Sequence, residues 1–241
     1  MVKMDFIMIV IALTLVSCEQ DDDIKSLKPL PLPEINISDT TLRYLALGDS
    51  YTIGHDVSEA ERWPVLLAEA LKAQNFDVDP PRIIARTGWA TDELSLAIDK
   101  EQIEDTFNIV SLLIGVNNQY RGRSAESFRP EFNALLGKAV AFAGNDTSRV
   151  FVLSIPDWGV TPFADGRDRD KIAREIVAFN AVIKEETALR NILFIDITPI
   201  SREAASDLSL LAPDQLHPSG IMYSRWVDEL LPALLLKLKK P

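Results

Sequence analysis

The feature that most constrains this chain is the alternation of short apolar runs with longer stretches of helical period. Runs rich in β-branched residues occupy 43–47, 82–85, 107–114, 149–155 and 192–197. Between them, apolar residues recur three and four positions apart in 60–74, 91–100, 126–143, 167–189 and 219–238. Short strands that alternate with amphipathic helices are typical of a parallel sheet covered by helices. The sequence therefore predicts an α/β fold with five strands.

Length and charge limit what such a fold could do. The 241 residues are enough for one substantial core, so one globular domain is expected. Lys and Arg number 25 and Asp and Glu 36, which gives a formal charge of 25 − 36 = −11. Because nucleic-acid affinity depends largely on cations that neutralise phosphates, this balance excludes a nucleic-acid partner.

The amino-terminal segment has the pattern of an export signal. Residues 6–16 are all apolar or Thr, a run too short to span a bilayer but suited to a signal peptide. It ends in Leu15-Val16-Ser17-Cys18, which resembles the lipobox of bacterial lipoproteins. Cys18 is the only cysteine, so lipidation is favoured over a disulfide, a metal site or a thiol nucleophile. We expect a signal peptide over 1–17 and an exported protein, lipid-anchored at the bacterial cell envelope.

An acidic, proline-containing segment follows Cys18. Acidic residues cluster between 19 and 23, and three prolines lie between 29 and 33. Proline supplies no backbone N–H for helix or ladder hydrogen bonds, and charge runs are usually solvated linkers. We therefore predict a tether over 18–40 and a folded domain over 41–241.

Polar and small residues follow four of the predicted strands. The first strand runs into Gly48-Asp49-Ser50, the second into Gly88 and the third into Asn117, while Asp214 and His217 lie in a loop after the last. In open parallel sheets, ligands bind beyond the carboxyl ends of the strands. We therefore expect these residues to meet at one edge of the sheet.

The residue types at this edge suit nucleophilic catalysis by serine. A serine becomes a nucleophile when a base removes its proton, and that base needs a third group to orient it. Only His55 and His217 are available as imidazole bases. Asp214, three residues before His217, could hold that ring, which makes Ser50, His217 and Asp214 the candidate catalytic residues. We expect His55 at the surface or the pocket rim.

Attack on an ester carbonyl also needs donors for the negative oxygen. The amide of Ser50, the amide of Gly88 and the side-chain amide of Asn117 are candidates for this oxyanion hole. Each position also has a purely structural explanation, because glycine permits a positive φ and asparagine is common in turns.

Taken together, these motifs resemble the SGNH/GDSL hydrolase family. The matching segments are Gly48-Asp49-Ser50-Tyr51, Gly88, Gly115-Val116-Asn117 and Asp214-x-x-His217, and the resemblance extends from about 42 to 236. It implies a flavodoxin-like three-layer α/β/α sandwich with sheet order 2-1-3-4-5, a Ser50–His217–Asp214 triad and an oxyanion hole from Ser50, Gly88 and Asn117. It implies no metal and no organic cofactor, and we expect a monomer.

Two positions depart from familiar patterns. Asn118 stands where the family commonly has Asp, so a carboxylate is missing from the third motif. Thr52 stands where a Gly-x-Ser-x-Gly elbow would need its second glycine, which argues against the α/β-hydrolase fold. After the fourth strand, Trp158 is a candidate substrate contact in the pocket wall, although a core tryptophan fits the pattern equally well.

The sequence thus predicts a serine ester hydrolase that acts through an acyl-enzyme on Ser50. Lysophospholipids or short-chain acyl esters are the expected substrates, and carbohydrate O-acetyl esters are the alternative. A further alternative is a surface module with the same fold that binds glycan without catalysis. Two-metal phosphodiester cleavage is disfavoured, because a single histidine beyond His217 leaves few ligands.

Overall fold

A five-stranded parallel sheet forms the centre of the structure, a computed structural model that describes residues 41–238. Its strands, in chain order, are β1 (Tyr44–Gly48), β2 (Arg82–Ala85), β3 (Ile109–Leu113), β4 (Val150–Leu153) and β5 (Leu193–Ile195). Their spatial order is β2-β1-β3-β4-β5, and every neighbouring pair is parallel. Each predicted strand overlaps an observed one, and the predicted fold class and sheet order are confirmed.

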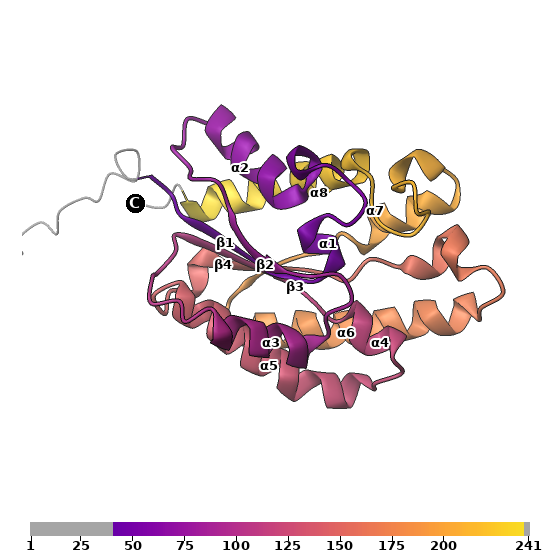
Figure 1. Cartoon of the computed structure of the whole chain (residues 1–241). Helices are drawn as coiled ribbons and strands as arrows, with labels where there is room; N and C mark the ends of the chain where they lie inside the picture. The colour runs from indigo at the N-terminus through magenta and orange to yellow at the C-terminus, as the bar shows by residue number, and fades with distance from the viewer. Residues whose placement is uncertain (1–40, 239–241) are drawn as a thin grey trace, which may run out of the picture. The chain divides into compact units, whose positions relative to one another are not determined.

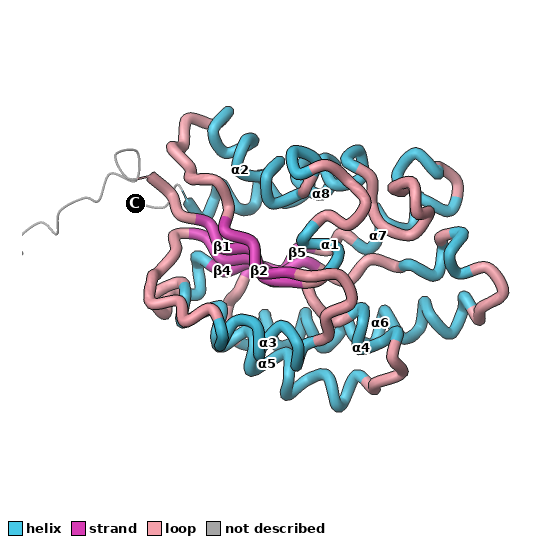
Figure 2. The backbone as a smooth tube through the Cα atoms, in the orientation of Figure 1, coloured by secondary structure: helices cyan, strands magenta, loops and turns pink. Residues whose placement is uncertain are grey.

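Helices cover both faces of the sheet and complete the three layers (Figure 1). On one face, α2 (Trp63–Ala73) packs against α8 (Gly220–Leu238). On the other, α5 (Ala125–Phe142) packs between α3 (Thr91–Lys100) and α6 (Arg169–Leu189). Figure 2 shows the strands enclosed between these helical layers. All residues of β1 and β3 are buried, which is why these central strands read as continuous apolar runs.

Several short elements have no counterpart among the predicted ones. Their three to five residues are too few to show a helical period. They are the helices α1 (Ser50–Ile53), α4 (Val116–Tyr120) and α7 (Thr198–Arg202) and the 3₁₀ turns η2 (Glu59–Glu61), η3 (Thr147–Arg149), η4 (Trp158–Val160), η5 (Pro162–Ala164), η6 (Glu203–Ala205) and η7 (Leu208–Leu210).

Two helices begin later than their periodicity predicts. The helix predicted over 60–74 begins at Trp63, because Pro64 is tolerated only in the first helical turn. The helix predicted over 167–189 begins at Arg169, because the Asp168 side chain accepts a hydrogen bond from the Lys171 amide and caps it.

The register of the sheet brings the candidate site together. Gly48, the last residue of β1, lies opposite Ala85 on β2 and Leu113 on β3. The segments after these three strands therefore leave the sheet at the same edge. A Cβ at Gly48 would lie 2.5 Å from the Leu113 carbonyl oxygen and 2.2 Å from the Thr52 hydroxyl, so this close approach requires glycine.

The predicted signal peptide, Cys18 and the tether lie outside the described residues. All of the described residues belong to one compact unit. Within 41–238, no helix combines the length and the apolar character needed to cross a bilayer.

Candidate active site

A cavity of about 200 Å³ opens at the carboxyl edge of the sheet. It brings together five of the residues proposed from the sequence: Ser50, Gly88, Asn117, Trp158 and His217. Asp214 does not line the cavity but contacts His217 from behind. The remaining lining residues are Tyr51, Thr87, Val116, Tyr120, Phe163 and Leu216.

Ser50 is the first residue of α1, directly after β1. Asp49 caps this helix, because its Oδ1 accepts a hydrogen bond from the Tyr51 amide at 3.0 Å. The Asp49 side chain is fully buried, and burial raises the pKa of its carboxyl to about 8. The Ser50 amide is one of the unpaired N–H groups of a helix start and donates to no protein group among the described residues.

His217 is fixed by Asp214 in a tight loop. Asp214 Oδ2 accepts a hydrogen bond from His217 Nδ1 at 2.5 Å, and Oδ1 accepts from the Leu216 and His217 amides at 3.0 and 2.9 Å. The Asp56 carboxylate accepts from the Asp214 amide at 2.9 Å, so the loop after α1 holds this turn as well. Because a carboxylate can only accept, the Nδ1–H tautomer is fixed and Nε2 remains the basic nitrogen.

The protonation of the His–Asp pair follows from this geometry. Burial lowers the pKa of His217 below its ordinary value, although the hydrogen bond to Asp214 acts in the opposite direction. Burial of Asp214 opposes ionisation, but hydrogen bonds from the His217 ring and from two backbone amides outweigh it and lower the pKa of this carboxyl. At neutral pH the pair therefore consists of a neutral imidazole and a carboxylate.

Ser50 and His217 share the cavity without a direct hydrogen bond in the described part of the chain. Both side chains are largely buried, with 4% and 7% of their surface exposed. Hydrogen bonds between catalytic groups are often long without substrate and tighten when it binds. Both side chains line the same cavity, where a bound ester could contact them together.

His55 lies at the rim of the site, as its sequence position predicts. Its ring is exposed, and the centroid of this ring lies 4.6 Å from that of the His217 ring. Its Nδ1 forms a hydrogen bond with the Thr87 hydroxyl at 2.9 Å. His55, Asp214 and His217 also form the one group within 41–238 whose ligand atoms could gather around a metal, all within 4.8 Å of one another. Asp214 Oδ2 and His217 Nδ1 are already joined by a hydrogen bond, which competes with metal binding through these two atoms.

Gly88 and Asn117 supply the other candidate oxyanion donors. Gly88 has φ +87°, and a Cβ there would meet no atom within 4 Å, so backbone conformation and not crowding by the protein requires glycine. Among the described residues, no protein group accepts a hydrogen bond from its amide. The Asn117 side chain donates one N–H to the Trp89 carbonyl at 3.0 Å, which fixes its orientation and leaves a second N–H free.

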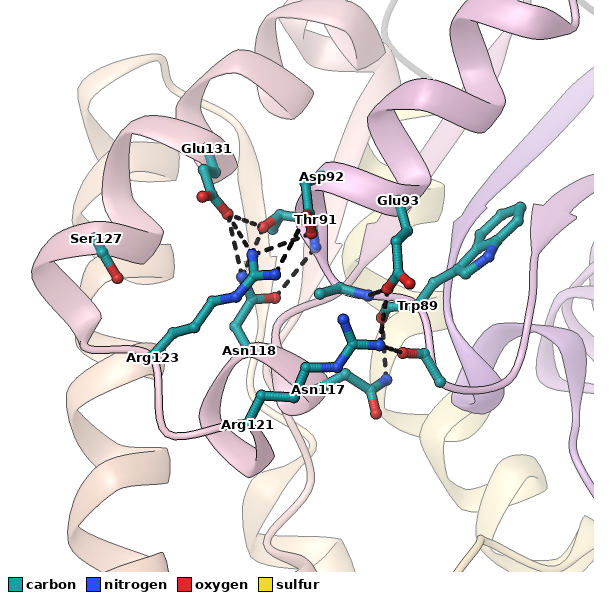
Figure 3. A network of polar contacts seen from close by, with 12 residues as sticks. Trp89, Thr91, Asp92, Glu93, Asn117, Asn118, Arg121, Arg123, Ser127 and Glu131 are labelled. Atoms are coloured by element: carbon teal, nitrogen blue, oxygen red, sulfur yellow. Dashed lines mark hydrogen bonds and ion pairs between the residues drawn. The ribbon is translucent and has the colours of Figure 1, made fainter.

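Asn118, the departure from the family pattern, is fully buried in a polar network behind the cavity (Figure 3). Its Oδ1 accepts from the Thr91 amide at 3.1 Å, and its Nδ2 donates to the Thr91 hydroxyl at 2.6 Å and to Glu131 at 3.2 Å. Arg123 pairs with both Glu131 and Asp92. A carboxylate, that of Glu131 from α5, therefore lies next to position 118.

The same network holds the loop that carries Gly88. Arg121 donates to the Gly88 carbonyl at 2.6 Å and pairs with Glu93 at 2.8 Å, and Glu93 in turn accepts from the Ala90 amide (Figure 3). With the contacts to Trp89 and Thr91, every residue of 88–91 has a backbone group bound by a side chain. The loop beside the cavity is therefore strongly preorganised. The sequence motifs did not indicate these partners.

Replacing Asn118 by aspartate should destabilise the protein. It would bring a buried carboxylate against Glu131 and remove an N–H donor, so we expect the free energy of unfolding at pH 7 to fall by about 1–3 kcal/mol. Urea unfolding measures the change. The deficit should shrink as the pH falls, because protonation removes the repulsion, and Asn118→Asp combined with Glu131→Gln should recover part of the loss. A double variant less stable than the sum of its single changes would contradict this explanation.

The aromatic wall of the cavity comes from two further segments. Trp158 has 4% of its surface exposed, and its indole N–H donates to the Gln119 side chain at 2.8 Å, so it is both a core residue and a lining residue. Tyr120 and Phe163 contact it and are 47% and 41% exposed. Neither was predicted as a site residue, because isolated aromatic residues in such short elements carry no spacing signal.

Comparisons with known proteins agree with this geometry. The model of the GDSL-like lipase/acylhydrolase family matches residues 46–225. A search of curated protein sequences gives no significant match.

Solved structures of low sequence identity have the same fold. The psychrotrophic esterase EstA from Pseudoalteromonas has a TM-score of 0.63 at 18% identity, covering 83% of this chain and 100% of that chain. Phospholipase A1 from Streptomyces albidoflavus has a TM-score of 0.60 at 20% identity, covering 82% and 100%. An acetyl-xylooligosaccharide esterase from Geobacillus has a TM-score of 0.60 at 18% identity, covering 83% and 95%.

Proposed function

Because this chain belongs to the GDSL-like lipase/acylhydrolase family, we propose that it is a serine ester hydrolase with Ser50 as nucleophile and His217 as general base. The observation that carries the proposal is the convergence of Ser50, Gly88, Asn117 and an Asp214-bound His217 on one cavity. These residues lie on segments far apart in the sequence, and packing alone does not require that combination of groups.

The proposed reaction begins when His217 Nε2 takes the Ser50 proton as Oγ attacks the ester carbonyl carbon. The imidazolium that forms is stabilised by Asp214 and then gives its proton to the leaving alcohol. This step leaves an acyl group on Ser50. Water, deprotonated by the same imidazole, attacks the acyl-enzyme, releases the carboxylic acid and restores the Ser50 hydroxyl.

The negative charge of each tetrahedral intermediate would fall near three preorganised donors. The Ser50 and Gly88 amides have no protein acceptor among the described residues, and one Asn117 side-chain N–H is free as well. Unpaired donors of this kind, fixed before the reaction, stabilise developing charge without a reorganisation cost.

The size of the cavity favours esters with short acyl groups. Its volume of about 200 Å³ is below the roughly 300–1,000 Å³ of pockets that enclose drug-sized ligands. The apolar side chains Val116, Trp158 and Leu216 suit a short hydrocarbon chain better than the long chain of a lysophospholipid.

A carbohydrate O-acetylesterase is the second candidate function. The specific observation that favours it is the half-exposed pair of rings, Tyr120 and Phe163, at the cavity mouth. Flat aromatic faces of this kind pack well against sugar rings, and an acetyl group is the smallest acyl group the cavity would take.

An active-site probe tests the proposed function directly. A fluorophosphonate should label the folded protein, and mass spectrometry of the digested product should find the label on Ser50. A panel of 4-nitrophenyl esters, acetylated xylan and lysophosphatidylcholine then ranks the substrates, and we expect two- to four-carbon acyl esters to react fastest. Folded protein that takes no label and hydrolyses no ester would favour the glycan-binding module instead.

Replacing Asn117 by alanine should lower kcat by roughly 10²-fold to 10³-fold, because one oxyanion donor is lost. KM should change little, since the donor acts mainly on the charged intermediate. The melting temperature checks that the fold survives loss of the hydrogen bond to Trp89. A decrease of only a few-fold in kcat would reassign Asn117 to a structural role.

The rate should rise with pH as His217 loses its proton. Because burial lowers the pKa of His217, we expect kcat/KM to reach half its maximum below the ordinary histidine value of about 6.5 and to be level at neutral pH. The measurement is kcat/KM for a 4-nitrophenyl ester between pH 4.5 and 8. His55→Gln should keep the rise, and its disappearance in that variant would reassign the base to His55.

We also propose that the protein is exported and lipid-anchored through Cys18, which rests on the sequence of residues 1–40 alone. Labelling with radioactive palmitate in a bacterial host tests it. The wild-type chain should incorporate the label and Cys18→Ser should not; equal incorporation by both would overturn the anchor.

A further inference from the structure

Arg167 is a cation without an acidic partner among the described residues, and it contacts rings that line the cavity without lining the cavity itself. It lies in the loop between η5 and α6, exposed to solvent, and forms no ion pair with any described carboxylate. Ten described arginines do form such pairs, in a chain with an excess of acidic residues. Arg167 is one of four described arginines that form no such pair, and among these four it is the one that contacts rings of the cavity.

Three aromatic rings that line the cavity contact this side chain. The guanidinium carbon of Arg167 lies 5.2 Å from the ring centroid of Tyr120, 5.4 Å from that of Trp158 and 5.2 Å from that of Phe163. All three rings line the cavity that contains Ser50. Cation–π contacts of this kind fix a guanidinium in place before a ligand binds.

Most of the donors of Arg167 are unused. Its Nη2 donates to the Tyr120 hydroxyl at 3.1 Å, and no other described residue accepts a hydrogen bond from its side chain. A guanidinium has five N–H donors in a planar fork that matches carboxylate and phosphate oxygens. Arg167 can therefore bind an anion while it stays on the aromatic wall.

The nearest acidic residues in the sequence are engaged elsewhere. Asp165 pairs with Arg169 at 2.6 Å, and Asp168 accepts from the Lys171 amide as the cap of α6. Arg169 also donates to the Gly159 and Thr161 carbonyls, so it fixes the loop itself. The two arginines thus differ in role: Arg169 holds the backbone, and Arg167 remains available to a ligand.

We propose that Arg167 and the aromatic wall form an anion subsite, so that the preferred substrate is a short-chain ester bearing a carboxylate or phosphate group away from the scissile carbonyl. This inference rests on the proposed esterase function and deepens it. The apolar cavity takes the uncharged part of the substrate, and the guanidinium beside the three aromatic rings binds a charged group that extends beyond the cavity. In a protein of net charge −11, such a subsite selects anions that the rest of the surface repels.

Matched charged and neutral substrates test the subsite. 1-Butyrylglycerol 3-phosphate is compared with 1-butyrylglycerol for a charge on the alcohol side, and monomethyl adipate with methyl hexanoate for a charge on the acyl side. Arg167→Gln should lower kcat/KM for at least one charged ester by roughly 10-fold to 100-fold, the range expected when a hydrogen bond to a charged group is lost. For the neutral esters the change should stay within about threefold, because Arg167 does not line the cavity that holds Ser50 and His217.

Two further variants distinguish the effect of the planar Arg167 guanidinium from the effect of positive charge in general. Arg174 of α6 is exposed, forms no ion pair in the described structure and does not line the cavity. Arg174→Gln removes the same charge and should leave the preference for the charged ester unchanged. Arg167→Lys should retain only part of it, because an ammonium lacks the planar fork. Melting temperatures confirm that all three variants are folded.

The result that would overturn the subsite is distinct from failure of the esterase itself. If Arg167→Gln affects charged and neutral esters equally, or Arg174→Gln reproduces its effect, the subsite is wrong while the esterase stands. If the protein hydrolyses the neutral esters but not the charged ones, the subsite is likewise wrong while the esterase stands. If Ser50 takes no fluorophosphonate label and no ester reacts, the proposed function itself fails.

Discussion

Replacing Ser50 by alanine should lower kcat for ester hydrolysis on the order of 10⁴-fold to 10⁶-fold. Without Oγ no acyl-enzyme can form, and only direct attack by water on a bound ester remains. Substrate binding should persist, because the cavity loses a single oxygen atom. The measurement is steady-state hydrolysis of a 4-nitrophenyl butyrate series, with fluorophosphonate labelling, which should also disappear.

A matched serine shows that the effect is local. Ser206 is exposed and donates its hydroxyl to the Glu203 carbonyl, away from the cavity. Ser206→Ala should retain wild-type kcat. If Ser50→Ala kept more than a few per cent of the wild-type rate with a normal melting temperature, the nucleophile would have to be sought elsewhere.

Replacing Asp214 by asparagine should lower kcat on the order of 10⁴-fold, while KM changes little. The local hydrogen bonds determine which way the amide would point. Oδ1 accepts from the Leu216 and His217 amides, so the asparagine oxygen must occupy that position. Its NH₂ group would then face His217 Nδ1, and the ring would carry its proton on Nε2. In that tautomer, His217 cannot accept the Ser50 proton.

Asp56 provides the control for this substitution. Its carboxylate lies in the same region and accepts only from the Asp214 amide, a role that the oxygen of asparagine can also fill. Asp56→Asn should therefore lower kcat by no more than a few-fold. A similar loss in both variants would show that the loop depends on negative charge in general and not on the His217 tautomer.

Asn118 shows how the site tolerates a departure from the family pattern. Glu131 of α5 lies beside the Asn118 amide and pairs with Arg123, so a carboxylate is present next to position 118. Thirteen residues separate the two positions along the chain. The side chain of the neighbouring Asn117, the proposed oxyanion donor, takes no part in these contacts and donates to the Trp89 carbonyl.

The meeting of the candidate catalytic groups at one edge of the sheet could be predicted because these groups are few and ordered. One serine follows the first strand, one aspartate lies three residues before a histidine, and parallel topology brings strand ends to a common edge. The fold class and sheet order followed from hydrophobic periodicity together with the family resemblance, because each strand or long helix must bury its apolar residues.

The pocket wall could not be predicted in the same way. Tyr120, Phe163 and Arg167 come from a short helix, a 3₁₀ turn and a loop, none of which has a sequence period. Even the helical period misled at one point, since it placed Arg167 inside α6, whereas capping by Asp168 leaves it outside. Side-chain contacts across segments fix these positions.

The sequence by itself determined the architecture and the order of the candidate catalytic groups, because periodicity and motif spacing are local properties of the chain. Only the tertiary structure decided the volume of the cavity, the contact of Arg167 with its aromatic wall and the partner of Asn118. These depend on distances between residues that are remote in sequence, and such distances exist only once the helices have packed on the sheet.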